Sequence, residues 1–132
     1  MSKKEMIYPQ GWDRYRRLTF APAVKKAGLI FLSGSSAIDH KTGEFVGEGD
    51  IVAQTGQIYK NMNEVLEAAG ASMADIVQTT DYITTTEGYK ETANIRREFF
   101  GDSFPASTGF IVPRLLNPKA LIEIDAIAVI GD

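Results

Sequence analysis

Two stretches near the C-terminus decide the fold: FPASTGFIVPRL at residues 104–115 and LIEIDAIAV at residues 121–129. Side chains of a β-strand point alternately to its two faces, so the second stretch predicts a strand with two different faces. The apolar face carries Ile122, Ile124, Ala126 and Ala128. The other face is mixed and carries Leu121, Glu123, Asp125 and Ile127. Burying unpaired acids is costly, so Glu123 and Asp125 either point into water or serve a function.

Composition limits what the protein can be. The 132 residues are 44% apolar, which predicts one globular domain over residues 1–132. The net charge of −3 leaves no basic field to attract nucleic acid, so no nucleic-acid partner is expected. No apolar run reaches the roughly 20 residues that span a bilayer, and the N-terminus lacks a secretory signal. We therefore expect a cytoplasmic protein without a membrane partner.

Cysteine and histidine are too rare for the commonest metal sites. The chain has no cysteine, hence no disulfide, no thiolate nucleophile and no cysteine zinc site. Its one histidine, His40, lies in the turn-like sequence DHKTG and is predicted to be a surface residue. No bound metal is expected.

The remaining pattern predicts an α+β fold. Strands are expected at residues 17–20, 29–33 and 76–85, with a hairpin-like connection at residues 25–28. Asp50 is a good N-cap for a long helix that stops at Gly70, and a second helix is expected at residues 88–100. The core-facing stripe of the first helix comprises Ile51, Thr55, Ile58, Met62, Val65, Leu66 and Ala69. Together with the two C-terminal stretches, these elements predict a single mixed β-sheet with two helices on one face.

The second face of such a sheet needs a cover if it is apolar. Val77, Ile83, Ile127 and Val129 are the apolar residues expected there. Association with further copies of the chain would cover them, and closed rotational symmetry is the usual form. We therefore expect an oligomer.

The order and spacing of several motifs resemble the Rid (reactive intermediate deaminase) proteins, also called YjgF-type or L-PSP-type. The motifs are FAPAV at 20–24, GLIFLSG at 28–34, Gln54, Gln57 and Asn61, AAGAS at 68–72, DIV at 75–77, Tyr82, Asn94, Phe99-Phe100, Pro105-Ala106 and IEIDAIA at 122–128. The resemblance implies a chorismate-mutase-like fold in a homotrimer with a central barrel. It also implies small-molecule pockets at the subunit interfaces and neither a metal nor an organic cofactor.

Deaminating members of this family hydrolyse enamines or imines of 2-amino acids to keto acids and ammonia. Their pocket has an arginine directly after Pro-Ala that binds the substrate carboxylate; this chain has Ser107 there. A hydroxyl cannot replace the bidentate guanidinium, and a charge-assisted hydrogen bond contributes roughly 1.5–3 kcal/mol. The resemblance also matches a pocket cysteine to Gly109 and a tyrosine to Ala23. These differences predict a larger, less positive pocket and an altered substrate, such as an aminomuconate-like catabolic intermediate.

Other pocket residues are retained. Glu123 matches the family glutamate that holds or activates the attacking water, the alternative being an ion pair across the subunit interface. Asn94 matches a pocket asparagine or is a polar residue of the helix surface. Ser107, Thr108 and Gly109 share one short strand, with Ser107 and Gly109 on one face, either at the pocket or at a strand edge.

Ser33 and Gly34 complete the substrate-binding set, together with Ala23. Arg97, three residues after Asn94, is a substitute contact for an anion or, alternatively, a solvated helix residue. Residues 1–15, with Tyr8 and Trp12, either pack as a tail or cover the pocket.

Three functions remain open at this stage. The first is hydrolysis of a reactive enamine or imine by a Rid-type deaminase with an altered substrate range. The second is small-ligand binding by a trimer without catalysis. The third is endoribonuclease activity, against which the acidic charge and the absence of a basic, aromatic stripe argue.

Overall fold

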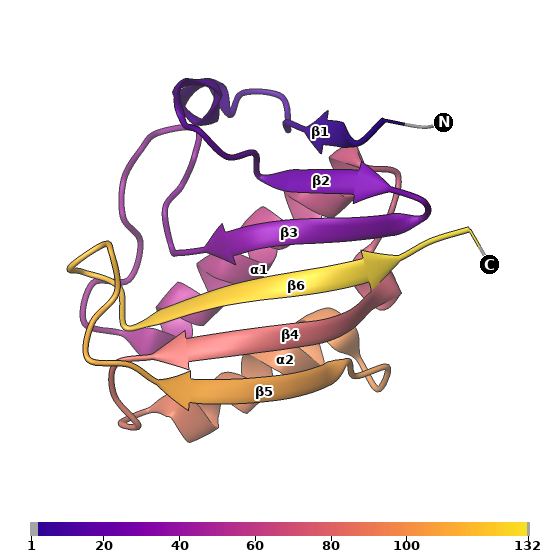
Figure 1. The fold of residues 1–132 in the computed structure, drawn as a ribbon. Coiled ribbons are helices and arrows are strands. Elements are labelled where there is room, and N and C mark those ends of the chain that lie inside the picture. The colour runs from indigo at the N-terminus through magenta and orange to yellow at the C-terminus, as the bar shows by residue number, and fades with distance from the viewer. Residues whose placement is uncertain (1–2, 132) are drawn as a thin grey trace.

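Six strands form one mixed sheet in the computed structural model, which describes residues 3–131 (Figure 1). The strands are β1 (Glu5–Ile7), β2 (Ala23–Lys26), β3 (Leu29–Ser35), β4 (Ile76–Ile83), β5 (Ala106–Ile111) and β6 (Ile122–Val129). The helices are α1 (Ile51–Ala68) and α2 (Ala93–Phe100), with 3-10 turns η1 (Asp13–Arg17), η2 (Met73–Asp75) and η3 (Tyr89–Thr92). The strand order is β1-β2-β3-β6-β4-β5, and the β4–β5 pair is parallel. Both α-helices lie behind the same face, so the predicted α+β architecture is confirmed.

The alternation predicted for the last strand is present. In β6, Ile122, Ile124, Ala126 and Ala128 are buried under the helices, and the residues between them are half-buried on the other face. Strand β6 lies between β3 and β4 at the centre of the sheet. Glu123 and Asp125 therefore stand on the uncovered face of a central strand.

Helix α1 begins and ends as predicted. The Asp50 carboxylate accepts hydrogen bonds from the backbone N–H groups of Val52 and Ala53, both at 3.1 Å. Gly70 follows the helix with a φ of +80°, which terminates it. All seven residues of the predicted stripe are buried, including Ile58 and Leu66 at 0% exposure.

The first hairpin differs from the prediction. Residues 17–20 form no strand; η1 ends at Arg17, and β2 begins only at Ala23. The connection consists of Ala27 and Gly28, whose φ angles of +54° and +78° suit a two-residue turn of the type I′ class. Gly28 is required because a Cβ there would lie 2.8 Å from the carbonyl oxygen of Ile130.

Residues 3–15 pack against the body of the protein; residues 1 and 2 of the segment considered above lie outside the described residues. Strand β1, which was not predicted, pairs with β2 at the edge of the sheet. Trp12 and Tyr15 are only 4% and 7% exposed. The indole N–H of Trp12 donates to the Glu64 carboxylate of α1 at 2.9 Å, which holds this segment in place.

One residue predicted for the uncovered face is buried instead. Ile83 is 4% exposed, whereas Val77 is 48% exposed. A β-bulge between Ile76 and Gln78 shifts the pairing of β4 with β6 by one residue. This shift reverses the faces of the residues that follow it, so Ile83 points toward the helices.

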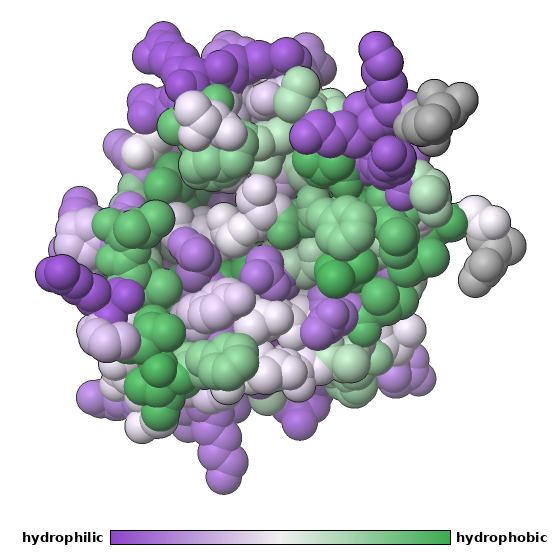
Figure 2. All heavy atoms as spheres, in the orientation of Figure 1, coloured by the Kyte–Doolittle hydropathy of each residue, from purple (hydrophilic) through white to green (hydrophobic). Residues whose placement is uncertain are grey.

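The uncovered face carries a mixture of apolar and polar side chains. Phe31 and Phe110 are 46% and 52% exposed, and Ile127 and Val129 are half-buried. Figure 2 shows apolar groups spread over this face with polar groups between them. No helix within residues 3–131 combines the length and the apolar character needed to cross a membrane.

Candidate functional site

Glu123 is held by the central strand β6 beside a second carboxylate. Asp125, two residues later on the same face, accepts a hydrogen bond of 3.2 Å from the Tyr82 hydroxyl. Among the described residues, the Glu123 carboxylate has no hydrogen-bond or salt-bridge partner. Burial, assisted by the charge of Asp125, raises the pKa of Glu123 above the usual carboxyl range. Glu123 is thus an available group for proton transfer, whereas Asp125 has a structural partner.

Gly34 leaves the space that the Glu123 carboxylate occupies. Strand β3 changes register between Leu32 and Ser35, and Gly34 lies in this irregular stretch. A Cβ on Gly34 would lie 2.7 Å from Oε2 of Glu123. The structure thus places Gly34, which was predicted as a substrate-binding residue, directly against the Glu123 carboxylate.

The Ser33 residue is hydrogen-bonded to the preceding segment of the same chain. Its hydroxyl donates to the Ala21 carbonyl at 2.6 Å, and its backbone N–H donates to the Pro22 carbonyl at 2.9 Å. These bonds fix the segment that leads into β2. Ala23, also predicted as a pocket residue, is 1% exposed and lies in the core.

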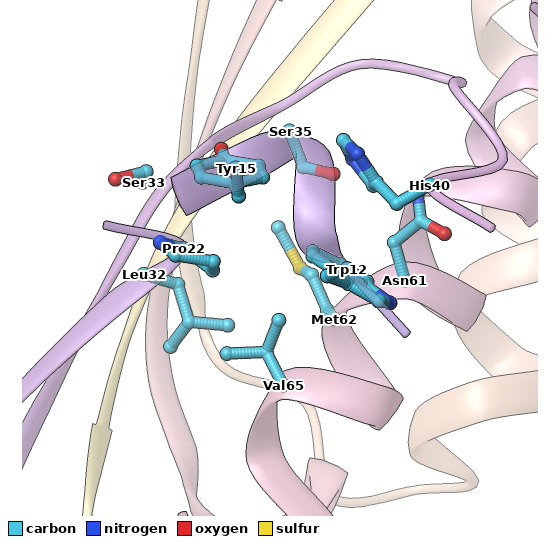
Figure 3. Close-up of a pocket in the computed structure, with 10 residues that line it drawn as sticks. All are labelled: Trp12, Tyr15, Pro22, Leu32, Ser33, Ser35, His40, Asn61, Met62 and Val65. Atoms are coloured by element: carbon cyan, nitrogen blue, oxygen red, sulfur yellow. The ribbon is translucent and has the colours of Figure 1, made fainter. Parts of the chain in front are cut away.

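A cleft of about 170 Å³ opens beside Glu123. It is lined by Tyr15, Leu18, Phe20, Gly34, Ser35, Ser36, Ile38, His40, Leu116, Asn117 and Glu123. A second cavity of about 10 Å³ adjoins it and shares Tyr15, Ser35 and His40 (Figure 3). That volume suits a single water molecule, and Ser33 and Asn61 add polar atoms to its wall.

The rings of Tyr15, Phe20 and His40 line one wall of the cleft, and Trp12 lines the small adjoining cavity. His40 stacks on Trp12 with ring centroids 4.2 Å apart and lies 5.2 Å from the Tyr15 ring (Figure 3). The Tyr15 ring contacts Phe20 edge-on at 5.8 Å. The prediction that His40 is a surface residue is wrong, because these rings cover it and leave it half-buried.

Burial also sets the protonation of these groups. It lowers the pKa of His40, against the opposing charges of Asp39 and Glu64, so the imidazole is neutral at pH 7. Burial and the neighbouring Glu123 charge raise the pKa of Tyr15 to about 12, so its hydroxyl stays protonated. The cleft therefore contains a neutral imidazole, a phenol and one carboxylate.

The predicted residues of β5 lie elsewhere. Ser107 and Gly109 are in register with Thr79 and Asp81, which are buried on the helix side of the sheet. The Thr79 hydroxyl donates to that of Ser107 at 3.1 Å. Ser107 and Gly109 share a face, as predicted, but it is opposite to the face of Glu123. One chain therefore does not bring them together in one pocket.

Thr108 points to the same face as Glu123, because its partner in register is Thr80, opposite Asp125. It does not line the cleft.

Asn94 and Arg97 contact each other on the surface of α2. Both are exposed, and the Arg97 guanidinium donates to the Asn94 side-chain oxygen at 3.2 Å. Neither residue lines the cleft. The contact reflects their spacing of three residues on one helix face.

A buried polar cluster on the helix side was not predicted. The Tyr89 hydroxyl donates to Asp81 at 2.6 Å, and the Arg96 guanidinium lies 3.8 Å from the same carboxylate. Burial raises the pKa of Asp81, although the Tyr89 hydrogen bond and Arg96 oppose the rise. The second Asp81 oxygen and the buried Tyr59 hydroxyl have no hydrogen-bond partner in the described chain. This cluster lies across the sheet from the cleft.

Of the residues that line the cleft, sequence reasoning named only Gly34 and Glu123 as site residues, and it did not single out the aromatic residues Tyr15, Phe20 and His40. The sequence signal for this wall was the presence of the aromatic residues Trp12 and Tyr15 in an otherwise polar N-terminal segment. No local pattern, however, links residue 12 to residue 40.

Known proteins resemble the chain over most of its length. Residues 15–130 match the model of the Endoribonuclease L-PSP family. A RutC family protein of Pyrococcus horikoshii is 41% identical over 110 residues, covering 83% of this chain and 85% of that protein. A human 2-iminobutanoate/2-iminopropanoate deaminase is 32% identical over 113 residues, covering 85% of this chain and 80% of that protein.

A solved structure agrees with the fold. The crystal structure of a conserved Rid family protein of unknown function from Yersinia pestis superposes with a TM-score of 0.86 at 30% sequence identity. The match covers 97% of this chain and 100% of the other.

Proposed function

Because this chain belongs to the Rid/YjgF/L-PSP superfamily, we propose that it is a hydrolytic deaminase of reactive enamines or imines that releases ammonia and a keto compound. The observation that carries the proposal is Glu123: a half-buried carboxylate with a raised pKa that faces an open cleft. Relatives named as deaminases support the same reaction class.

Hydrolysis of a C=N bond needs a group that accepts and returns protons. Water attacks the imine carbon while Glu123 takes a proton from it, and the π electrons of the C=N bond move to nitrogen, which is protonated. Glu123 passes this proton to the nitrogen, which gives a neutral carbinolamine. Glu123 then takes the hydroxyl proton of the carbinolamine and delivers it to the amino nitrogen, so that the C=O bond forms as the C–N bond breaks and ammonia leaves. Glu123 ends the cycle ionised, and one water has been consumed for each ammonia released.

We propose an altered substrate range because Ser107 stands where the family resemblance places an arginine. Without that guanidinium a carboxylate loses a bidentate partner. The substrates to be tested for ammonia release therefore include larger imines, less acidic imines and an aminomuconate-like compound.

We also propose that the active assembly is a homotrimer with the uncovered sheet faces directed toward a central barrel. The exposed apolar residues Phe31, Val77 and Phe110 support an interface on that face. The separation of Ser107 from Glu123 supports pockets completed between subunits. Sedimentation equilibrium should give three times the chain mass; a monomer at micromolar concentration would refute this arrangement.

Endoribonuclease activity and ligand binding without turnover are the two alternative functions that an activity test must distinguish from deamination. The family model is described as an endoribonuclease, which favours including RNA as a substrate. Ser107 stands where the family resemblance places an arginine, and this favours ligand binding without turnover as the second alternative.

Ammonia release from imines generated in situ by amino-acid and amine oxidases tests the proposal. We expect release above the spontaneous rate, and a reduction of roughly 10²- to 10⁴-fold for Glu123→Ala. Full activity in that variant would disprove the assignment of Glu123. RNA cleavage without imine hydrolysis would replace the proposal.

A further inference from the structure

The charge of the Glu123 cleft restricts its substrate. Among the residues that the structure describes, Glu123 is the one acidic residue that lines the cleft, and no lysine or arginine lines it. Within residues 3–131, the other titratable groups in its wall are His40 and Tyr15, which are neutral at pH 7. The part of the cleft that one chain forms is therefore negative, in contrast to a site built for carboxylates.

Two cations of the neighbouring loops have other partners. The Arg14 guanidinium donates to the Thr42 carbonyl at 3.2 Å. Lys41 lies 3.8 Å from the Glu64 carboxylate. Neither side chain lines the cleft. A substrate carboxylate bound there would face Glu123 without a positive partner among the residues of the same chain that line the cleft, which is unfavourable in a partly desolvated site.

The walls of the cleft suit an apolar substituent. Leu18, Phe20 and Leu116 are 47%, 55% and 100% exposed, and Tyr15 adds a further ring. A cavity of roughly 150 Å³ accepts a benzene ring, and this cleft measures about 170 Å³. An aryl or alkyl group can therefore enter it while the reacting carbon stays near Glu123.

We propose that the Glu123 cleft selects iminium ions that carry an apolar substituent and no carboxylate. This selectivity rests on the proposed deaminase function. A protonated imine pairs with the Glu123 carboxylate and is the more electrophilic form toward water. The balanced reaction is R–CH=NH₂⁺ + H₂O → R–CHO + NH₄⁺, and it needs no oxidant or reductant. Two-electron oxidation of a primary amine is the class of reaction that supplies such an imine.

Two substrates that differ only in a carboxylate provide the kinetic test. An amine oxidase converts 2-phenylethylamine to its aldimine, and an L-amino-acid oxidase converts phenylalanine to 2-imino-3-phenylpropanoate. We expect kcat/KM for the aldimine to exceed that for the imino acid by roughly tenfold or more, the value of one lost charged hydrogen bond. Preference for the imino acid would overturn the inference.

A charge placed at the mouth of the cleft should change this ratio. Leu116 is fully exposed, so Leu116→Arg can introduce a cation with little effect on folding, and Leu116→Gln is the neutral control. Leu116→Arg should shift the ratio toward the imino acid by roughly tenfold, while Leu116→Gln leaves it unchanged. Equal ratios in both variants would contradict the electrostatic reasoning.

Binding measured without turnover separates this inference from the proposed reaction. His40 is the only histidine, so its imidazole proton resonance in the untagged protein reports on the cleft. The cation 2-phenylethylammonium should shift this resonance saturably and bind roughly tenfold more tightly than phenylpyruvate. Tight cation binding without hydrolysis would disprove the deaminase function but support the selectivity. Tighter binding of phenylpyruvate, or no binding of the cation, would disprove the selectivity whatever the turnover.

Discussion

Substituting Gly34 by alanine should impair catalysis without harming the fold. The added Cβ would lie 2.7 Å from Oε2 of Glu123, whereas ordinary contact begins near 3.4 Å. The carboxylate must therefore withdraw by about 0.7 Å. Gly34 has no positive φ, so alanine fits the backbone and the effect falls on the side chain of Glu123.

The size of the loss follows from this displacement. A misplacement of about 1 Å can cost on the order of a hundredfold in rate, so we expect Gly34→Ala to lower kcat/KM between about tenfold and a hundredfold. Ammonia release from oxidase-generated imines, coupled to glutamate dehydrogenase, measures the change. The urea midpoint should stay close to that of the parent protein.

Gly56 provides the matched control. It lies inside α1, and a Cβ there would contact nothing within 4 Å. Gly56→Ala should leave activity unchanged and stabilise the helix by about 0.5–1 kcal/mol. Equal activity of Gly34→Ala and Gly56→Ala would refute the reasoning that the position of Glu123 governs the reaction.

Three further predictions concern charge and backbone strain. Asp125→Asn removes a like charge that raises the pKa of Glu123, so the acidic limb of the pH–rate profile should move to lower pH; an unmoved limb would mean that another group controls it. Because burial raises the folded-state pKa of Asp81, its contribution to stability is greatest below the unfolded pKa and is lost as pH rises through the folded value. Asp81→Asn should flatten that decline as the pH rises above the unfolded pKa of about 4 in urea unfolding, whereas an unchanged slope would contradict the assignment. Ala27 has a φ of +54°, so Ala27→Gly should stabilise the hairpin by about 1 kcal/mol in thermal unfolding, and Ala27→Val should destabilise it.

The elements that could be predicted from sequence are those defined by local periodicity. The alternation in residues 121–129 predicted the faces of β6, and the apolar spacing after Asp50 predicted the buried stripe of α1. Both succeed because the geometry of a strand or helix relates near neighbours directly. The prediction for Ile83 was wrong because the bulge between Ile76 and Gln78 reverses the face to which Ile83 points.

The candidate site depends on contacts that no local pattern contains. Sequence named Glu123 and Gly34 as separate site residues, and only the structure shows their contact. Trp12, Tyr15 and His40 likewise meet only when the N-terminal segment folds back against α1. Sequence likewise placed Ser107 and Gly109 on one face of a strand. Only the sheet order showed that this face is opposite to that of Glu123, because strand pairing across long loops sets which side each strand presents. Local alternation thus determined the strands and helices, while tertiary packing decided the composition and the charge of the cleft.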